Sequence, residues 1–398
     1  MATRVVLGVA GGIAAYKACE LLRLLTESGH AVRVVPTEAA LRFVGEPTWA
    51  ALSGQPVATD VWSDVHEVPH VRIGQTADLI VVAPATADLL AKAAHGLADD
   101  LLTNTLLTAR CPVLLAPAMH TEMWEHHATQ ANVATLRSRG VIVLEPASGR
   151  LTGADTGKGR LPEPAEIFAM ARRVLRHGAA SGTDLAGRRV VVTAGGTREP
   201  LDPVRFLGNR SSGKQGYAFA RTAAARGASV VLISANVELP DPAGVSVCRV
   251  GTTEELRKAT LAAAADADAV IMAAAPADFR PAEMAPEKIK KADGAPPVLR
   301  LVTNPDIAAE LGERKPDGQV LVVFAAETAD AVANARTKLV RKKADLIVVN
   351  EVGVDKVFGQ DTNRVTILSA DGERADLDEA PKEDVADAVW DRVAARLR

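Results

Sequence analysis

The chain has 398 residues, of which 48% are hydrophobic and 24% are charged, and a protein of this size and composition is expected to form two or three globular domains. Its 46 basic and 49 acidic side chains give a net charge of −3, which argues against a general nucleic-acid-binding protein. No apolar run approaches the ~20 residues that a membrane-spanning helix needs, so we expect no membrane partner.

The cysteines predict a reducing environment. Cys19, Cys111 and Cys248 are far apart and form no CxxC pair, a pattern that predicts free thiols and neither a disulfide framework nor a zinc site. The apolar stretch near the start, residues 5–16, is interrupted by glycines and continues into a helical pattern, unlike a secretion signal. We therefore expect a cytoplasmic protein.

Short Val/Ile/Leu runs alternate with Ala/Leu-rich stretches of helical period along the first half. The predicted elements are a strand at 5–7, a helix at 14–25, strands at 31–35, 79–82, 113–115 and 141–144, and a helix at 165–176. Such alternation predicts βαβ units around a buried parallel sheet. The small and polar residues 177–183 that follow predict a domain boundary.

The second half repeats this order of elements. Residues 189–196 resemble residues 4–12, and residues 225–233 and 268–278 resemble residues 27–35 and 78–88. The sequence thus predicts two doubly wound, Rossmann-like parallel-sheet α/β domains in tandem, at 1–177 and 188–398, joined by a linker at 178–187. Each domain opens with a glycine turn between strand and helix, which predicts two sites for phosphorylated ligands.

The loops of the first half favour a flavin mononucleotide over a dinucleotide. Residues 8–17 lack the GxGxxG spacing of a dinucleotide fingerprint, which weakens a dehydrogenase interpretation. Thr37 follows the second strand, where a hydroxyl can bind a phosphate or simply cap a helix; both remain open. The small residues after the strand at 79–82 allow a flat ring to approach the backbone, and His70 is a candidate acid or base.

These motifs resemble the flavin-dependent cysteine decarboxylases, specifically phosphopantothenoylcysteine decarboxylase. His70, APATAD at 83–88, GLADDLL at 96–102 and PAM at 117–119 occur in the family's order. The resemblance implies a flavodoxin-like domain in which FMN oxidises a substrate thiol, CO2 leaves, and the reduced flavin returns the electrons. It implies His70 as a catalytic residue and these FMN-binding residues: Gly11, Gly12, Ile13, Ala14, Thr37, Ala85 and Thr86.

The implied substrate-binding residues are Met119, His120 and Gly153, and two of them depart from the family. His120 stands where the family has asparagine, although an imidazole still donates a hydrogen bond. Gly153 replaces the cysteine of a glycine-rich flap that is thought to protonate the product. The glycines of the flap remain, so we expect closure over the substrate with another group, His120, Asp155 or water, as the acid.

The second half carries two polar, glycine-rich stretches, TAGGTREPLDPVR at 193–205 and GNRSSGKQG at 208–216, which read as a phosphate cradle. Gly208–Lys214 has the GxxxxGK spacing of a P-loop. However, Gln215 replaces the hydroxyl residue that holds magnesium, and a long insertion separates the motif from its strand, so a P-loop NTPase is rejected. Asp278 ends a strand and is a plausible Mg2+ ligand.

The second half resembles phosphopantothenate–cysteine ligase through TREPLDPVR, NRSSGK, AAPADF, PEKIKK and NPDI. The resemblance implies a nucleotide-binding domain that activates 4'-phosphopantothenate with CTP as an acyl-cytidylate before cysteine displaces CMP. It assigns Lys288 to the first half-reaction, Asn209 to the second and Asp278 to the metal. The implied CTP-binding residues are Ala275, Asp278, Lys288, Asn304, Pro305, Asp306, Ile307, Phe324, Lys338 and Lys342.

Taken together, the two resemblances imply a bifunctional enzyme of coenzyme A biosynthesis that acts on 4'-phosphopantothenate, L-cysteine and CTP. They also imply a homo-oligomer with FMN at subunit contacts. Three alternatives remain open: a ligase whose flavin domain has drifted, a flavin-binding regulatory protein, and an NAD(P)-dependent reductase.

Overall fold

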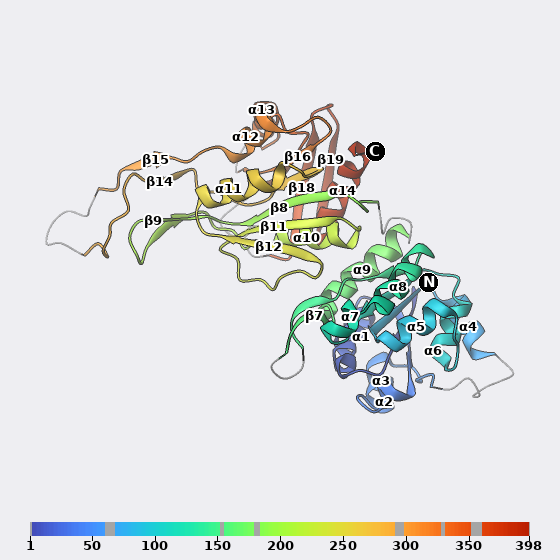
Figure 1. Cartoon of the computed structure of the whole chain (residues 1–398). Coiled ribbons are helices and arrows are strands. Elements are labelled where there is room, and N and C mark those ends of the chain that lie inside the picture. The colour runs from blue at the N-terminus through green and yellow to red at the C-terminus, as the bar shows by residue number, and fades with distance from the viewer. Residues whose placement is uncertain are drawn as a thin grey trace. The chain divides into compact units, whose positions relative to one another are not determined.

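The computed structural model describes residues 2–59, 68–151, 155–178, 184–290, 298–327, 331–351 and 360–397. The chain divides into two compact units, Met1–Asp184 and Leu185–Arg398 (Figure 1). Residues 179–183 of the expected linker and Gly153 of the expected flap lie outside the described residues. Within the described ranges, no helix is both long and apolar enough to cross a bilayer.

The first unit is a five-stranded parallel sheet in the order β2-β1-β3-β4-β5, the flavodoxin-like order. Its strands are β1 (Arg4–Val9), β2 (Ala31–Pro36), β3 (Leu79–Ala85), β4 (Val113–Pro117) and β5 (Ile142–Val143), and a hairpin of β6 (Ala147–Arg150) and β7 (Thr156–Arg160) follows. Its helices are η1 (Ile13–Lys17), α1 (Ala18–Glu27), α2 (Glu38–Leu41), α3 (Glu46–Ser53), α4 (Pro69–Thr76), α5 (Ala87–His95), α6 (Leu101–Thr108), α7 (Thr121–Glu125), α8 (His127–Ser138) and α9 (Pro164–His177). The predicted helix at 14–25 thus begins as a 3-10 turn.

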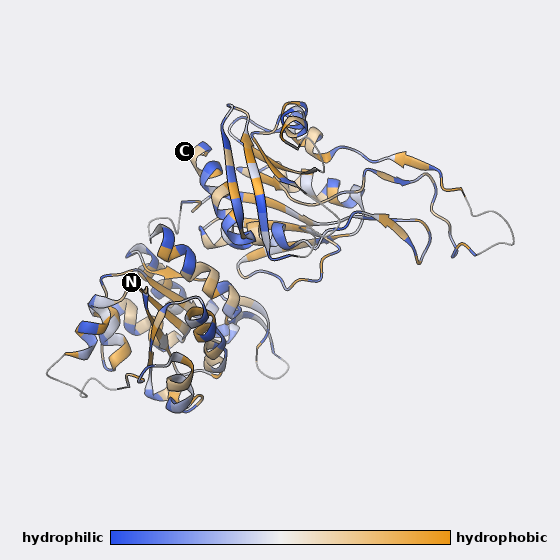
Figure 2. Cartoon of the chain, turned by 180° about the vertical axis from the view of Figure 1, so that it is seen from behind, coloured by the Kyte–Doolittle hydropathy of each residue, from blue (hydrophilic) through white to orange (hydrophobic). Residues whose placement is uncertain are grey.

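Helices cover both faces of this sheet. Helices α1, α3 and α9 pack together, while α5 contacts α6 and α8, and α4 contacts α6. All seven residues of β3 are buried, as expected for a central parallel strand that is covered on both faces. Figure 2 shows the same distribution, with hydrophobic strands inside and hydrophilic turns of the helices outside.

The second unit is an eight-stranded sheet in the order β12-β11-β8-β13-β16-β17-β18-β19. These strands are β8 (Arg189–Gly195), β11 (Ser229–Ala235), β12 (Val245–Val250), β13 (Ala269–Met272), β16 (Val320–Glu327), β17 (Leu346–Glu351), β18 (Thr362–Ser369) and β19 (Arg374–Pro381). The first six parallel strands follow the Rossmann order, so the doubly wound prediction is confirmed. Strands β18 and β19 extend one edge as an antiparallel pair that the sequence did not predict.

The helices of the second unit form two layers with separate cores. Their bounds are α10 (Lys214–Ala225), α11 (Thr253–Ala264), α12 (Ile307–Arg314), α13 (Ala331–Arg341) and α14 (Lys382–Arg396). On one face, Trp390 of α14 donates its indole N–H to the Phe219 carbonyl of α10 at 3.1 Å, and the two rings meet edge to face. The opposite core includes residues of α11, α12 and α13.

Two short antiparallel ribbons project from this sheet: β9 (Arg198–Pro200) with β10 (Phe206–Gly208), and β14 (Phe279–Pro281) with β15 (Leu301–Thr303). Figure 1 shows them reaching away from the sheet on the same side, and β9 contacts β14. Both ribbons originate at the carboxyl ends of β8 and β13, which is where an open α/β sheet of this order binds its ligand.

Candidate active sites

In the first unit, the loops after β1 and β3 meet at the point where the strand order reverses. The Ala10 N–H donates to the Pro84 carbonyl at 3.1 Å, which ties the two loops together. A Cβ added to Gly12 would lie 3.7 Å from the methyl group of Thr86, an ordinary contact distance. At Gly11 it would lie 2.3 Å from the Cβ of Ala39, so only glycine lets this turn pass the start of α2. The structure therefore brings these predicted FMN-binding loops together.

Two threonines offer hydroxyl protons at this site. The Thr37 oxygen accepts the Ala40 N–H at 3.2 Å, and the Thr86 oxygen accepts the Leu89 N–H at 3.3 Å, so each caps a helix. Within the described ranges neither hydroxyl has an acceptor for its own proton, which leaves both able to donate to a ligand. Nearby, the Ile13 side chain is 65% exposed. Free donors beside an exposed apolar side chain fit a phosphorylated ring compound such as FMN.

The turn after β4 lies against the hairpin of β6 and β7, which flanks the expected flap and is called the flap below. The Met119 N–H donates to the Gly159 carbonyl of β7 at 2.9 Å. A Cβ at Gly159 would approach the Met119 carbonyl to 2.2 Å, and one at Gly157 would approach the Thr121 hydroxyl to 2.2 Å. Glycines therefore allow the flap to pack directly on the turn that carries Met119 and His120. The exposed His120 is also the N-cap residue of α7, although its side chain makes no capping bond.

The base of the flap is held by charges. Glu145 pairs with Lys158 of β7 at 2.6 Å and with Arg137 at 2.8 Å, and Lys158 also lies 5.9 Å from the centre of the Trp124 ring. Burial would raise the pKa of Glu145, but these two cations hold that pKa below its usual value. The carboxylate form, and with it the anchor of β7, is favoured at neutral pH.

His70 is placed apart from the Gly12–Thr86 group. It lies in the first turn of α4, and its main-chain carbonyl accepts the Thr108 hydroxyl of α6 at 2.9 Å. Thr108 ends the helix that leads to the start of β4, whereas the FMN candidates lie at the carboxyl ends of the strands. The Nδ1 atom of His70 is buried and has no hydrogen-bond partner in the part of the chain that the structure describes. Among the described residues, no hydrogen bond joins the His70 side chain to the FMN candidates.

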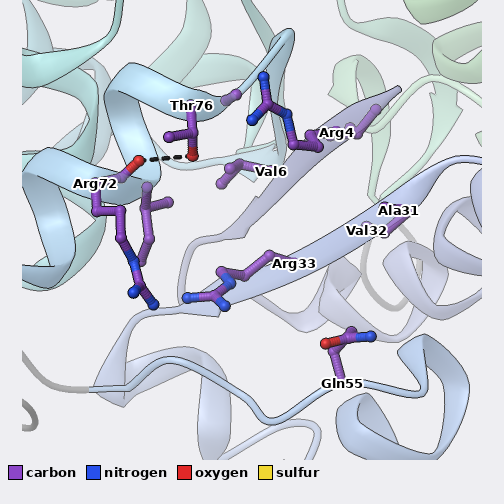
Figure 3. Close-up of a pocket in the computed structure, with 11 residues that line it drawn as sticks. Arg4, Val6, Ala31, Val32, Arg33, Gln55, Arg72 and Thr76 are labelled. Carbon is purple, nitrogen blue, oxygen red and sulfur yellow. Dashed lines mark hydrogen bonds between the residues drawn. The ribbon is translucent and has the colours of Figure 1, made fainter. Parts of the chain in front are cut away.

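A cavity of about 220 Å³ lies at the opposite, amino-terminal ends of β1 and β2. Figure 3 shows the side chains of Arg33 of β2 and Arg72 of α4 extending toward each other among the residues that line it, which include Val32. None of the predicted site residues lines it. The candidate flavin site therefore lies elsewhere than this hollow.

In the second unit, the loops after β8 and β13 are bonded to each other. Gly196 and Ala275 form an isolated parallel bridge, and the Ala275 N–H donates to the Gly195 carbonyl at 2.8 Å. The Asn209 amide donates to the Pro276 carbonyl at 2.9 Å, and a Cβ at Gly196 would lie 2.6 Å from the Asn209 carbonyl. Asn209 and Ala275, both predicted from sequence, therefore lie together.

Asp202 connects this group to the segment that carries Lys288. Its carboxylate accepts the main-chain N–H groups of Val204 and Arg205, each at 2.8 Å, and that of Ile289 at 3.1 Å. The Arg205 guanidinium donates to the same carboxylate and to the Ile289 carbonyl. Burial of Asp202 would raise its pKa, but these donors hold the pKa well below its usual value. Lys288 directly precedes Ile289, so these bonds hold the main chain beside it, and the residue itself is exposed.

Several predicted CTP-binding residues have structural partners. Asp306 caps α12 by accepting the Ala309 N–H at 3.1 Å and pairs with Lys342 at 3.1 Å. Burial would raise the pKa of Asp306, but the charge of Lys342 lowers it below its usual value. Ile307 is 1% exposed, and the half-buried Phe324 meets Phe219 edge to face at 5.5 Å between centroids. Pro305 and Lys338 are also half-buried.

Asp278 is the exposed carboxylate at the end of this loop. Among the described residues, no group of three His, Cys, Asp or Glu side chains gathers as a metal centre. A single carboxylate nevertheless fits Mg2+, which usually takes one or two protein carboxylates and completes its shell with water and phosphates.

Sequence reasoning missed the supporting residues. Asp202, Glu199 and Thr253 were given no role, although each holds a loop of the candidate site. Asp202 and Glu199 both lie in the distinctive TREPLDPVR stretch. Acidic residues within such a polar, glycine-rich stretch are the sequence feature that could have indicated a loop-holding role.

Comparisons with known proteins define the class first. Residues 1–176 match the family model described as Flavoprotein, and residues 185–397 match the model described as DNA/pantothenate metabolism flavoprotein C-terminal domain. The chain is therefore a two-domain protein with a flavoprotein domain followed by a pantothenate-metabolism domain.

Relatives that match along the full chain define the family. The chain is 59% identical over 405 residues to the coenzyme A biosynthesis bifunctional protein CoaBC of Mycolicibacterium smegmatis, covering 99% of this chain and 98% of the relative. It is 44% identical to the Bacillus subtilis protein of that name, covering 98% and 96%. The chain belongs to the family of bifunctional coenzyme A biosynthesis proteins and has both a decarboxylase and a ligase activity.

Solved structures match the two units separately. The crystal structure of a CoaBC C-terminal domain is 36% identical, with a TM-score of 0.47, and the match covers 54% of this chain and 98% of that chain. A PPC decarboxylase mutant complexed with pantothenoylaminoethenethiol is 31% identical, with a TM-score of 0.41, over 44% of this chain and all of the other. Because the curated relatives match both halves, the ligase-only, regulatory and reductase alternatives are not favoured.

Proposed function

We propose that the domain at 1–177 binds FMN and decarboxylates phosphopantothenoylcysteine, and that the domain at 188–398 forms this compound from 4'-phosphopantothenate and cysteine with CTP and Mg2+. The observation that carries the proposal is the pairing of loops at the switch point of each sheet, Ala10 with Pro84 and Gly196 with Ala275. Both pairs lie where doubly wound sheets bind nucleotides.

In the decarboxylase domain, Thr37 and Thr86 donate their free hydroxyl protons to the flavin nucleotide, and Gly12 allows it to approach the backbone. FMN, when bound, supplies the two-electron oxidation of the substrate thiol that makes loss of CO2 possible. Ile13 and Ala14 begin η1 directly after the first of these loops, and Ala85 ends β3 directly before Thr86. Met119 and His120 orient the substrate beneath the flap, with His120 donating a hydrogen bond to its carboxylate.

His70 acts on the substrate from a second copy of the chain. It packs against the end of α6, away from its own Gly12–Thr86 group, and its buried Nδ1 has no partner within the described residues. Apolar side chains on the projecting ribbons support subunit contacts in the other domain as well: Phe206 is 51% exposed, Phe279 50% and Leu301 45%. We therefore propose a homo-oligomer with flavin at subunit contacts.

In the ligase domain, Lys288 neutralises charge as the substrate carboxylate approaches the α-phosphate of CTP. Asp278 holds Mg2+, and Lys338 and Lys342 hold phosphates, Lys342 from its ion pair with Asp306. Asn209, bonded to Pro276 beside Ala275, serves the attack of cysteine on the acyl-cytidylate. Pro305, Ile307 and Phe324 shape the nucleoside pocket. The free cysteines support a cytoplasmic setting for both reactions.

The test is mass spectrometry of the products after purified, flavin-loaded protein meets 4'-phosphopantothenate, L-cysteine, CTP and Mg2+. Phosphopantetheine together with CMP and pyrophosphate is the expected result, and it would show that a group other than a cysteine at position 153 supplies the final proton. Accumulated phosphopantothenoylcysteine would contradict the decarboxylase proposal alone. The absence of CMP would contradict the ligase proposal.

A further inference from the structure

A buried hydrogen-bond network lies beneath the ligase site and joins three of its loops. Its members come from the loop after β8, the start of α11, the loop after β13 and the turn before α12. Their exposed fractions are small: Thr197 0%, Glu199 3%, Thr253 0%, Ala277 4% and Asn304 9%. Buried polar groups of this kind are costly unless each is bonded, so the pattern of bonds fixes the loops relative to one another.

Each bond in the network has a direction. Glu199 accepts the main-chain N–H of Thr253 at 2.8 Å and its hydroxyl proton at 2.7 Å through the same carboxylate oxygen. The Thr253 oxygen can then only accept, and the hydroxyl of Thr197 lies 2.8 Å away as a donor. Thr197 in turn accepts the Ala277 N–H at 2.9 Å. A chain of bonds therefore runs from Glu199 to the loop that ends in Asp278.

Asn304 closes the network from the other side. Its amide nitrogen donates to the Ala277 carbonyl at 2.8 Å and to the Thr253 hydroxyl oxygen at 3.3 Å, which uses both protons. Its amide oxygen accepts from Arg280 at 2.9 Å, and its main-chain N–H donates to the Asp278 carbonyl at 2.9 Å. The side chain has no proton left for a nucleobase.

We propose that Glu199, Thr253 and Asn304 are positioning residues that hold the Ala277–Asp278 turn in place for the metal-bound triphosphate, and that the Asn304 amide does not read the base. The inference rests on the ligase function proposed above and changes the role of Asn304 within it. Removing the Thr253 hydroxyl takes one hydrogen bond from each of Glu199, Thr197 and Asn304. Buried polar groups that lose a partner are costly, so the turn is then held less firmly.

The experiment compares Thr253→Val, Thr253→Ser and Thr260→Val in the full-length protein. Thr260 is a matched control, because it is a fully buried threonine of the same helix. Among the described residues its hydroxyl bonds only to Leu256 of that helix, at 2.6 Å. Pyrophosphate release is measured against CTP, UTP and Mg2+ concentrations. Hydrogen–deuterium exchange of the peptide that spans residues 273–279 reports the turn directly, without any ligand.

We expect Thr253→Val to lower kcat/KM for CTP roughly tenfold and to raise the Mg2+ concentration needed for half-maximal rate. The preference for CTP over UTP stays unchanged, the exchange of residues 273–279 rises, and Thr253→Ser restores the wild-type values. Thr260→Val, which removes an equally buried hydroxyl, leaves the turn's exchange and the Mg2+ dependence as in the wild type.

Two results would overturn the inference while the ligase function stands. One is a Thr253→Val protein with wild-type exchange at 273–279 and wild-type Mg2+ dependence. The other is an Asn304→Ser protein that loses its preference for CTP over UTP, because Asn304 would then contact the base. A wild-type protein that releases no pyrophosphate with CTP would instead contradict the proposed function itself.

Discussion

The two units use the same region of a doubly wound sheet in different ways. At the flavoprotein site, Thr37 and Thr86 cap helices and keep their hydroxyl protons for a ligand. At the ligase site, the polar side chains bond mainly to one another and to main-chain groups, as Glu199, Thr253 and Asn304 do. The first site therefore has hydroxyl donors available for a ligand, whereas the second holds its own loops in position.

This contrast predicts that the two activities separate cleanly, and His70→Gln gives the largest expected effect. Loss of a general acid or base lowers a rate by about 10²–10⁴-fold, so decarboxylation should nearly stop while pyrophosphate release continues. Product mass spectrometry and a pyrophosphate assay measure the two consequences, and the flavin absorption spectrum checks that the variant still binds its flavin. His95→Gln, an exposed histidine at the end of α5, is the control. A His70→Gln protein with normal decarboxylation would remove His70 from the site.

The reciprocal substitution is Lys288→Gln. It removes the charge that we propose faces the α-phosphate, and the loss of one electrostatic donor of this kind costs about 10²–10³-fold in kcat. Pyrophosphate release from 4'-phosphopantothenate and CTP measures this step, while decarboxylation of added phosphopantothenoylcysteine should be unchanged. Lys290→Gln is the control, since it removes the same charge two residues away on the same exposed segment. Equal losses in both variants would contradict a specific role for Lys288.

A substitution with a smaller expected effect tests whether the flap packs on the turn that carries Met119 and His120. In Gly159→Ala, the new Cβ would lie 2.2 Å from the Met119 carbonyl, so β7 must move away from Met119 and His120. A displacement of about 1 Å near a reacting centre costs up to about 10²-fold, and we expect a 10- to 100-fold loss of decarboxylation. Gly140→Ala is the matched control. Gly140 also has positive φ, but nothing lies within 4 Å of its added Cβ. Similar losses in both would assign the effect to backbone strain alone.

The sequence predicted the fold well because parallel strands buried on both faces are continuous apolar runs, as in β3 and β8. It did not predict β19, where alternate residues are exposed and no long apolar run marks the strand. At the ligase site it predicts roles for Lys288 and Asn209 through the family resemblance, and the structure places Asn209 against Pro276. It could not identify Thr253, because nothing local shows that this hydroxyl bonds to Glu199, 54 positions away.

The smallest expected effect is that of Asp202→Asn on the free energy of unfolding. Asp202 matters to the comparison because its hydrogen bonds hold loops of the ligase site in position without a ligand. Its folded pKa lies well below the usual value because main-chain N–H groups and Arg205 stabilise the carboxylate, although burial opposes them. A lowered folded pKa means that this stabilisation is complete above the unfolded pKa of about 3.9 and is lost as the pH falls below it. The difference in unfolding free energy between the wild type and Asp202→Asn should therefore be constant at neutral pH and shrink below about pH 4.

Chemical denaturation of both proteins at a series of pH values measures this difference. Asp241→Asn is the control, because the Asp241 carboxylate pairs with Arg249 at an exposed site. Such pairs contribute little to stability, so its curve should follow the wild type throughout. If the Asp202→Asn protein were as stable as the wild type at neutral pH, the bonds to Ile289 would not hold the Lys288 segment in place. The ligase site would then depend on its ligands for order.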